Sequence, residues 1–368
     1  MDYSALLAAL RENDAVRLRL FLESAEFVSD GDGPWCTPTL LDCLTAGDDD
    51  NDEREGGEEV DARKRDILEI LVQHGADVNV DIKMEEFCDL VLPGKSAVMF
   101  AAERGFLKCV QFLDASGADL SAVCVTGETA LHFAVKQKRF QCVKYLAKRM
   151  APSALNSKDE DGMTALMLAT FLPREESCFL YVQHLIACGA DLNAEDAKGR
   201  TALMFALRFS LPAVVYLLLD SGAAYGNVAP DGFAPLTVAF GRMHSNLGCI
   251  IKLLEKGEDP TLSRRNLAIV HRAVCWNEKA LIRSLVMNGH PPLNMPSETF
   301  RLLEPCERSQ LSPLAMAFLC KTPEVANYFI ANRFFTYSDV VSLHQDAYIR
   351  KSLLVPSVLS LKPKFTLL

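Results

Sequence analysis

A five-residue pattern recurs along this sequence at a nearly constant interval. It reads Gly-x-Thr-Ala-Leu or a close variant, and an Ala follows three residues after the Leu. Successive copies end at Leu131, Leu166, Leu203 and Leu236, at intervals of 35, 37 and 33 residues. Such an interval is too short for a separate domain, so it predicts a chain built of stacked structural repeats.

A second pattern closes each repeat. An apolar run with i, i+3, i+4 spacing leads into Gly-Ala-Asp, most clearly before Gly75, Gly117 and Gly189. The Thr of the first pattern suits a helix N-cap, and this Gly suits the left-handed residue that ends a helix. Each unit is therefore predicted to be a pair of antiparallel helices. Neighbouring pairs must stack, because one pair cannot bury its apolar face alone.

Together the two patterns resemble the ankyrin repeat, which has a period of about 33 residues and a Thr-Pro-Leu-His-x-Ala signature. The resemblance covers residues 1–336 and implies an all-α solenoid of about eight or nine helix pairs with projecting β-turn loops. The signature His occurs only at His132 and His271, and Met99, Met167 and Met204 replace it elsewhere. We therefore expect apolar packing to replace most of the family's Thr–His hydrogen bonds.

An acidic run interrupts the repeats near the amino end. Residues 48–59 hold eight acids and one Arg, a net charge of −7 within a total of −10. We predict a disordered insertion near residues 47–61, because lengthening a loop costs little free energy. The alternative is that the run docks onto a basic partner.

The rest of the composition restricts the class of partner. Without the acidic run the chain is nearly neutral, so it lacks the basic footprint that nucleic acids require.

The longest strongly apolar stretch, near Leu211–Leu219, is shorter than the roughly 20 residues of a membrane span. The amino end has no basic segment typical of a secretory signal. The twelve Cys form no CxxC pair, which indicates reduced thiols in a cytosolic or nuclear protein.

Motifs for catalysis are not found in the sequence. His271 and Cys275 could share a metal, but Zn needs three or four ligands and no others lie near. His132 and Cys142 could form a nucleophile–base pair, yet both lie at ordinary repeat positions. We therefore predict a monomeric, non-catalytic protein without metal or cofactor, which binds another protein.

The ankyrin resemblance also implies where a partner would bind. Partners of that family commonly contact the turn before the Thr and the residues just after the conserved small residue. At these positions the sequence has Thr126, Glu128, Lys136, Gln137, Glu160, Met163, Phe171, Leu172, Lys198, Arg200, Arg208, Phe209, Phe233 and Arg242. Arg and aromatic residues are enriched at binding hot spots. The alternative is that Phe171 and Phe209 tuck under neighbouring turns.

A second apolar series recurs at the repeat period, two residues after each signature Leu. We predict that these side chains pack between repeats and do not contact a partner. The series is Phe100, Phe133, Leu168, Phe205, Val238 and Met316.

Residues 337–368 no longer follow the repeat. Their apolar pattern is similar to the SOCS box, which recruits elongin B/C and a cullin in the ankyrin-and-SOCS-box family. The resemblance places Leu343 against elongin C and puts Ala347 where the motif usually has Cys. It assigns Leu359 and Leu361 to the cullin segment and Phe365 to the apolar end.

The sequence also departs from this motif. The Cys is missing, both motif prolines are displaced or absent, and Lys351 occupies an apolar position. Two interpretations therefore remain open for residues 337–368. They form either the docking segment of a cullin-RING ubiquitin-ligase substrate receptor or a cap on the last repeat.

Overall fold

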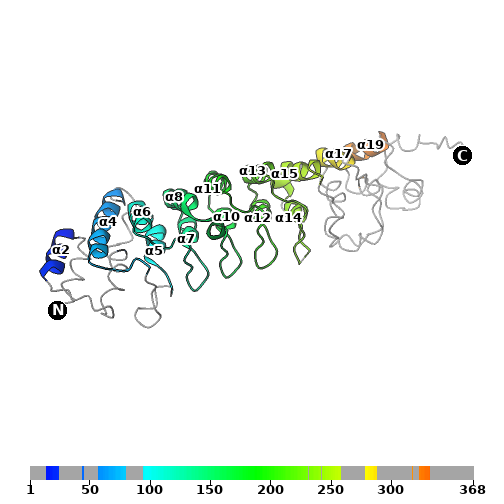
Figure 1. Ribbon diagram of the computed structural model, residues 1–368. Helices are drawn as coiled ribbons and strands as arrows, with labels where there is room; N and C mark the ends of the chain where they lie inside the picture. The colour runs from blue at the N-terminus through cyan, green and yellow to red at the C-terminus, as the bar shows by residue number, and fades with distance from the viewer. Residues whose placement is uncertain are drawn as a thin grey trace, which may run out of the picture. The chain divides into compact units, whose positions relative to one another are not determined.

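The computed structural model describes residues 14–24, 44, 57–79, 94–230, 232–241, 243–257, 278–287, 317 and 323–331. Every regular element in these ranges is a helix, as Figure 1 shows. Contacts divide the chain into two compact units. The first comprises Met1–Phe205 and Asp220–Ala223, and the second comprises Ala206–Leu219 and Ala224–Leu368. The all-α prediction is confirmed.

The helices of the first unit are short. They are α2 (Ala15–Ser24), α4 (Gly57–Gln73), α5 (Ala97–Arg104), α6 (Leu107–Ala115), α7 (Ala130–Lys136), α8 (Phe140–Arg149), α9 (Pro152–Leu155), α10 (Ala165–Ala169) and α11 (Glu175–Ala187). The boundary between the units lies within α12 (Ala202–Arg208). The second unit holds most of α13 (Pro212–Asp220), with α14 (Pro235–Phe240), α15 (Met243–Glu255), α17 (Lys279–Met287) and α19 (Pro323–Ala331).

The helices pack as pairs, and the pairs of the first unit form two rows. The pairs are α5 with α6, α7 with α8, and α10 with α11. First helices pack on one another from α5 through α7 to α10, and second helices pack from α4 through α6 and α8 to α11. Figure 1 shows the turns projecting beneath the row of first helices. In the second unit α14 pairs with α15, which also packs on α17.

The first helices α5, α7 and α10 begin directly after the Ser or Thr of the recurring pattern, whereas α14 begins after Ala234. Thr164 has an extended backbone, and its side-chain oxygen accepts a hydrogen bond from Met167 N at 3.4 Å. Ser96 N donates instead to Met99 Sδ at 3.5 Å. Met99 and Met167 are buried, as expected, but the Met99 sulfur also serves as a weak acceptor. Local capping therefore sets where these helices start.

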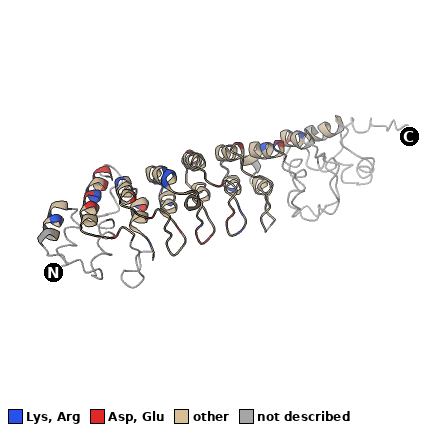
Figure 2. Cartoon of the chain, viewed as in Figure 1, with Lys and Arg blue, Asp and Glu red and all other residues tan. Residues whose placement is uncertain are grey.

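Helix α4 corrects the prediction of a disordered insertion near residues 47–61, because residues 57–61 are helical. Figure 2 shows that this helix carries both acidic and basic residues. Asp61 is buried and accepts hydrogen bonds from Lys108 N at 2.7 Å and Cys109 N at 3.0 Å. Those amides lie in the first turn of α6, where Phe106 at the N-cap offers no side-chain acceptor. An acid just after the run, Asp61, therefore caps a neighbouring helix, while residues 47–56 lie outside the described ranges.

Candidate functional site

The turns before α7, α10 and α12 are each closed by two main-chain hydrogen bonds. In the first such turn Cys124 N donates to Glu128 O at 3.0 Å, and Gly127 N donates to Cys124 O at 2.9 Å. The same two bonds recur over residues 159–163 and 196–200. The turns therefore present their side chains from a fixed backbone.

Adjacent turns are also joined to each other by main-chain hydrogen bonds. Glu160 N donates to Thr126 O at 2.9 Å, and Ala197 N donates to Asp161 O at 3.0 Å. Gly162 has a φ of +75°, and a Cβ there would lie 2.5 Å from Ala197 N. Close contact between turns thus requires glycine at this position.

Glu128 holds the turn of its repeat to the end of the following helix. Its carboxylate lies 2.5 Å from Lys136 Nζ and accepts a hydrogen bond of 2.8 Å from Thr126 Oγ1. Burial alone would raise the pKa of Glu128, but the hydrogen bonds from Lys136 and Thr126 bring the pKa below its ordinary value. Both carboxylate oxygens are thus occupied, whereas the Lys136 side chain is still 43% exposed.

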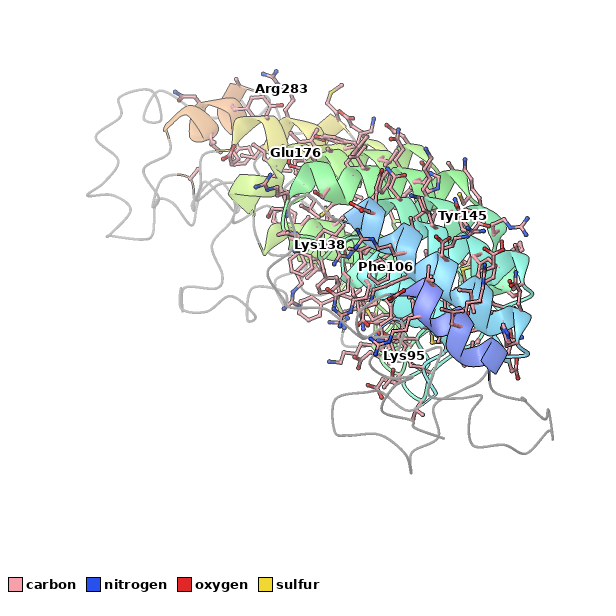
Figure 3. The ribbon with its side chains drawn as sticks, turned by 90° about the vertical axis from the view of Figure 1, so that its left-hand side faces the viewer. Lys95, Phe106, Lys138, Tyr145, Glu176 and Arg283 are labelled. Carbon is pink, nitrogen blue, oxygen red and sulfur yellow. The ribbon has the colours of Figure 1, made fainter. Side chains whose placement is uncertain are left out.

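The preceding repeat carries the same ion pair with the charges reversed. Lys95 and Glu103 lie 33 positions before Glu128 and Lys136, and their charged atoms are 2.5 Å apart. Lys95 Nζ also lies 4.2 Å from the Phe100 ring centroid and 4.3 Å from that of Phe133. Figure 3 shows Lys95 on the first-helix side of the unit, away from Tyr145. Its buried cation therefore links two repeats through both aromatic faces.

The next repeat replaces this ion pair with apolar residues. Met163 and Phe171 occupy the positions of Glu128 and Lys136, 35 residues further on. Met163 is buried, but Phe171 is 49% exposed, and its ring centroid lies 5.1 Å from that of buried Phe205. Phe171 is therefore an exposed aromatic side chain that is supported on one side, and it is not tucked under a turn.

Arg200 supports the same aromatic cluster from the following turn. Its guanidinium carbon lies 4.8 Å from the Phe205 ring centroid, and Nη2 lies 2.5 Å from Asp196 Oδ2. Asp196 is buried and also accepts hydrogen bonds from the backbone of Lys198 and Arg200. The turn thus fixes Arg200 while leaving part of its side chain exposed.

The fourteen residues predicted to contact a partner differ in exposure. Lys136, Gln137, Glu160, Phe171, Lys198, Arg208 and Phe209 are exposed, and Thr126, Arg200 and Phe233 are half-buried. Glu128, Met163 and Leu172 are buried, which corrects the expectation that they offer surface to a partner. Arg242 lies outside the described residues.

The structure adds Lys95, Asp196 and Phe205 as residues that shape this face. Lys95 could have been found in the sequence, because it shares the repeat position of Glu128. Within the apolar series Phe100, Phe133 and Phe205 are buried, and Leu168 and Val238 are half-buried. Met316 lies outside the described residues.

His132 is a structural residue at the start of helix α7. Its Nδ1 accepts from Thr129 N at 3.1 Å and from Thr129 Oγ1 at 2.9 Å, which leaves Nε2–H to donate to Met163 O at 3.1 Å. Burial holds the pKa of His132 below its ordinary value, so the ring is neutral at pH 7. Burial also raises the pKa of Cys142 to about 12, which keeps this thiol protonated and unreactive.

The described residues contain neither a cluster of metal ligands nor a membrane-spanning helix. Among the described residues no three His, Cys, Asp or Glu side chains gather around a common point. His271, Cys275 and residues 337–368 lie outside those ranges. None of the described helices is long and apolar enough to cross a bilayer.

A family model of three ankyrin-repeat copies matches residues 98–182 and 174–264. These residues form an ankyrin-repeat array. The array is 33% identical over 49% of the chain to the mouse nuclear factor NF-kappa-B p105 subunit, and 34% over 51% to human neurogenic locus notch homolog protein 2. The matches cover 18% and 7% of those proteins.

The name of a third relative combines the ankyrin repeat with the SOCS box. The chain is 30% identical over 55% of its length to ankyrin repeat and SOCS box protein 6 of Pongo abelii. The match covers 45% of that protein. The chain thus spans less than half the length of each of these three relatives.

Proposed function

We propose that this chain is a non-catalytic adaptor that holds a partner polypeptide against its turns and first helices. Repeat arrays offer such extended surfaces, and the fold alone does not specify the partner. The observation that carries the proposal is Phe171, half exposed and supported by Phe205. A rigid, exposed aromatic beside an Arg is the usual composition of a binding hot spot.

We define the contact face by its exposed and half-buried members in the first unit. They are Thr126, Lys136, Gln137, Glu160, Phe171, Lys198 and Arg200. In the second unit Arg208, Phe209 and Phe233 are proposed as contacts as well. Glu128 and Asp196 are positioning residues, because each holds one cation in place.

The test compares Phe171→Ala with Val16→Ala, which removes an exposed apolar side chain from α2. Partners captured by the full-length wild-type chain are identified by mass spectrometry, purified and titrated calorimetrically against each variant. We expect Phe171→Ala to weaken binding about 10-fold or more, as truncation of a hot spot does. Val16→Ala should bind like the wild type. Equal affinity of all three proteins would reject the contact face.

A more specific function is that of a substrate receptor in a cullin-RING ubiquitin ligase. It is favoured by the SOCS-box-like pattern of residues 337–368 and by the similarity to ankyrin repeat and SOCS box protein 6. The proposed contacts with elongin B/C and a cullin are Leu343, Ala347, Leu359, Leu361 and Phe365.

This second function has a direct test. The full chain and its Leu343→Asp variant are mixed with purified elongin B/C and passed over a sizing column. Co-elution of the wild type alone would support the receptor function. If neither protein co-elutes while an authentic SOCS-box protein does, residues 337–368 act as a cap and the adaptor function stands alone.

A further inference from the structure

One repeat of the array differs from the rest of the chain in charge. Residues 129–158 contain seven Lys or Arg residues and no Asp or Glu, in a chain whose net charge is −10. This stretch forms α7, α8 and α9, and Figure 2 shows basic residues gathered on α8. Seven cations without an intervening acid thus lie on α7, α8 and α9 and the residues that flank them.

Four of these seven cations are engaged within the protein. Lys136 pairs with Glu128, and Arg149 pairs with Asp114. Arg139 Nε donates to Glu103 O at 3.2 Å, and Lys158 Nζ donates to Glu195 O at 2.7 Å. Arg139, Arg149 and Lys158 thus join neighbouring repeats, and the Lys136–Glu128 pair stabilises its own repeat.

The other three cations are Lys138, Lys144 and Lys148, which we call the basic ridge. All three are exposed, and no side chain of the ridge forms a hydrogen bond or an ion pair with another described residue. Lys144 and Lys148 are one turn apart on α8, and Lys138 lies two residues before its start. The ridge therefore runs from the turn before α8 into the last turn of that helix, and its helical part from Phe140 to Lys148 rises about 12 Å at 1.5 Å per residue.

The acid beside the ridge is already neutralised. Asp114 of α6 accepts hydrogen bonds from Tyr145 at 2.6 Å and Arg149 at 2.8 Å. Its charge is thus balanced by Arg149, which leaves the lysines of the ridge available to an anionic partner.

An exposed apolar side chain lies on α11, the second helix of the next repeat. Helix α11 packs on α8, with 5.0 Å between the ring centroids of Phe140 and Tyr181. His184 Nε2 lies 3.3 Å from Lys144 O. Leu180, just before Tyr181 and one turn before His184, is 50% exposed. It therefore offers an apolar contact next to the ridge.

We propose that the basic ridge and Leu180 form a docking surface for an acidic polypeptide segment that carries an apolar residue. Carboxylates would pair with the three lysines, and the apolar side chain would cover Leu180. Polypeptide fits better than a phosphate polymer, because three cations on α8 and the turn before it, in a chain with net charge −10, give no continuous basic track. The surface belongs to second helices, so it goes beyond the proposed function and would give the adaptor a second partner.

The probe is a fluorescein-labelled peptide with a central Leu flanked by runs of Glu, and its fluorescence anisotropy is titrated with the full chain at low salt. A second peptide has Ser in place of Leu. The ridge variant is Lys144→Gln with Lys148→Gln. The charge-matched control is Arg19→Gln with Arg283→Gln, which changes exposed residues of α2 and α17. Gln keeps helix propensity close to that of Lys, and thermal unfolding checks the fold of each variant.

We expect the ridge variant to bind the Leu peptide about 3- to 30-fold more weakly, as the loss of two exposed ion pairs predicts. The control should stay within about twofold of the wild type, since distant charges are screened. Leu180→Ser should weaken binding of the Leu peptide and leave binding of the Ser peptide unchanged.

Three outcomes would overturn the proposal. The first is equal weakening by the ridge variant and the control, or no binding by the wild type. The second is ridge-dependent binding of duplex RNA or phosphatidylserine vesicles with no binding of the peptides. The third is peptide binding that the wild type lacks and that appears only when residues 48–50 and 52 are changed from Asp to Asn. Such a result would mean that the acidic run of the wild-type chain itself occupies the ridge.

Discussion

His132 joins two repeats through both of its ring nitrogens, which contact Thr129 on one side and Met163 O on the other. Met99, Met167 and Met204 take the same repeat position elsewhere and are buried as well. The fold thus accepts either a hydrogen-bonding ring or a flexible apolar side chain of similar volume at this position.

Replacement of His132 separates the contribution of volume from that of the hydrogen bonds. We expect His132→Met to lower the free energy of unfolding by about 1–2 kcal/mol, because Met163 O loses its donor. His132→Ala should cost about 1–2 kcal/mol more, because it also leaves a cavity. Urea unfolding at pH 7.5 measures both variants. Equal losses of unfolding free energy in the two variants would mean that side-chain volume at position 132 does not contribute to stability.

The burial of His132 also predicts a dependence of stability on pH. Its pKa in the folded protein lies below the ordinary value of 6.5, so the unfolded chain binds more protons as the pH falls through 6.5. This contribution to stability is complete above that pH and is lost below it. Between pH 7.5 and 5.5 the wild type should lose about 1 kcal/mol more than His132→Met. Parallel losses in urea unfolding at the two pH values would contradict this expectation.

Substitutions at Gly162 and Gly189 separate two losses of unfolding free energy. One arises from a steric collision between turns, and the other arises from a left-handed backbone conformation. Both have positive φ, but a Cβ at Gly162 would collide with Ala197 N, whereas one at Gly189 has nothing within 4 Å. Gly189→Ala should cost about 1 kcal/mol. Gly162→Ala should cost about 1–3 kcal/mol more, as overpacking does. Unfolding free energies within experimental error of each other would show that the turns can move apart.

Capping of α6 by Asp61 shows how one helix fixes the start of the next. The carboxylate belongs to α4, yet it satisfies two amide groups at the beginning of α6. This contact ties the first described repeat to its neighbour through a polar interaction as well as through apolar packing.

Asp61→Ala should lower the free energy of unfolding by about 1–2 kcal/mol, as the loss of an N-cap does. Asp66→Ala is the matched control, because this exposed acid of α4 pairs with the partly exposed Arg65, a contact worth about 0.5 kcal/mol. Hydrogen exchange should also become faster at the amides of Lys108 and Cys109 in Asp61→Ala. Unchanged exchange there would contradict the capping role.

The start of each first helix could be predicted from the sequence, because the signals are local. Thr129 and Thr164 precede their helices directly, as the pattern indicated. The cap on α6 could not be predicted, because Asp61 lies 47 residues before Lys108. Burial of Glu128 and Met163 was missed for a similar reason: both depend on residues of a neighbouring repeat or on the far end of the following helix.

Contacts in the first unit run from each repeat to the next, as the packing of α4, α6, α8 and α11 shows. Stability in such arrays is the sum of repeat and interface contributions, and each helix pair depends mainly on its neighbours. A local defect should therefore remain local.

Leu146→Ala tests this dependence, because Leu146 is fully buried in α8. The substitution should cost about 2–5 kcal/mol. Hydrogen exchange followed by mass spectrometry should show faster exchange in α7, α8 and the helices packed on them. Exchange in α14 and α15 should keep its wild-type rate. A uniform increase throughout the chain would indicate a single cooperative unit.

The hydrogen bonds that join neighbouring turns have a consequence for how this protein can change. Glu160 N to Thr126 O and Ala197 N to Asp161 O are bonds between peptide groups, which nearly every amino acid supplies. Side chains at the turn tips take no part in them. New specificities can therefore arise by substitution at positions such as Glu160 and Lys198 without a new scaffold, provided that Gly162 is kept.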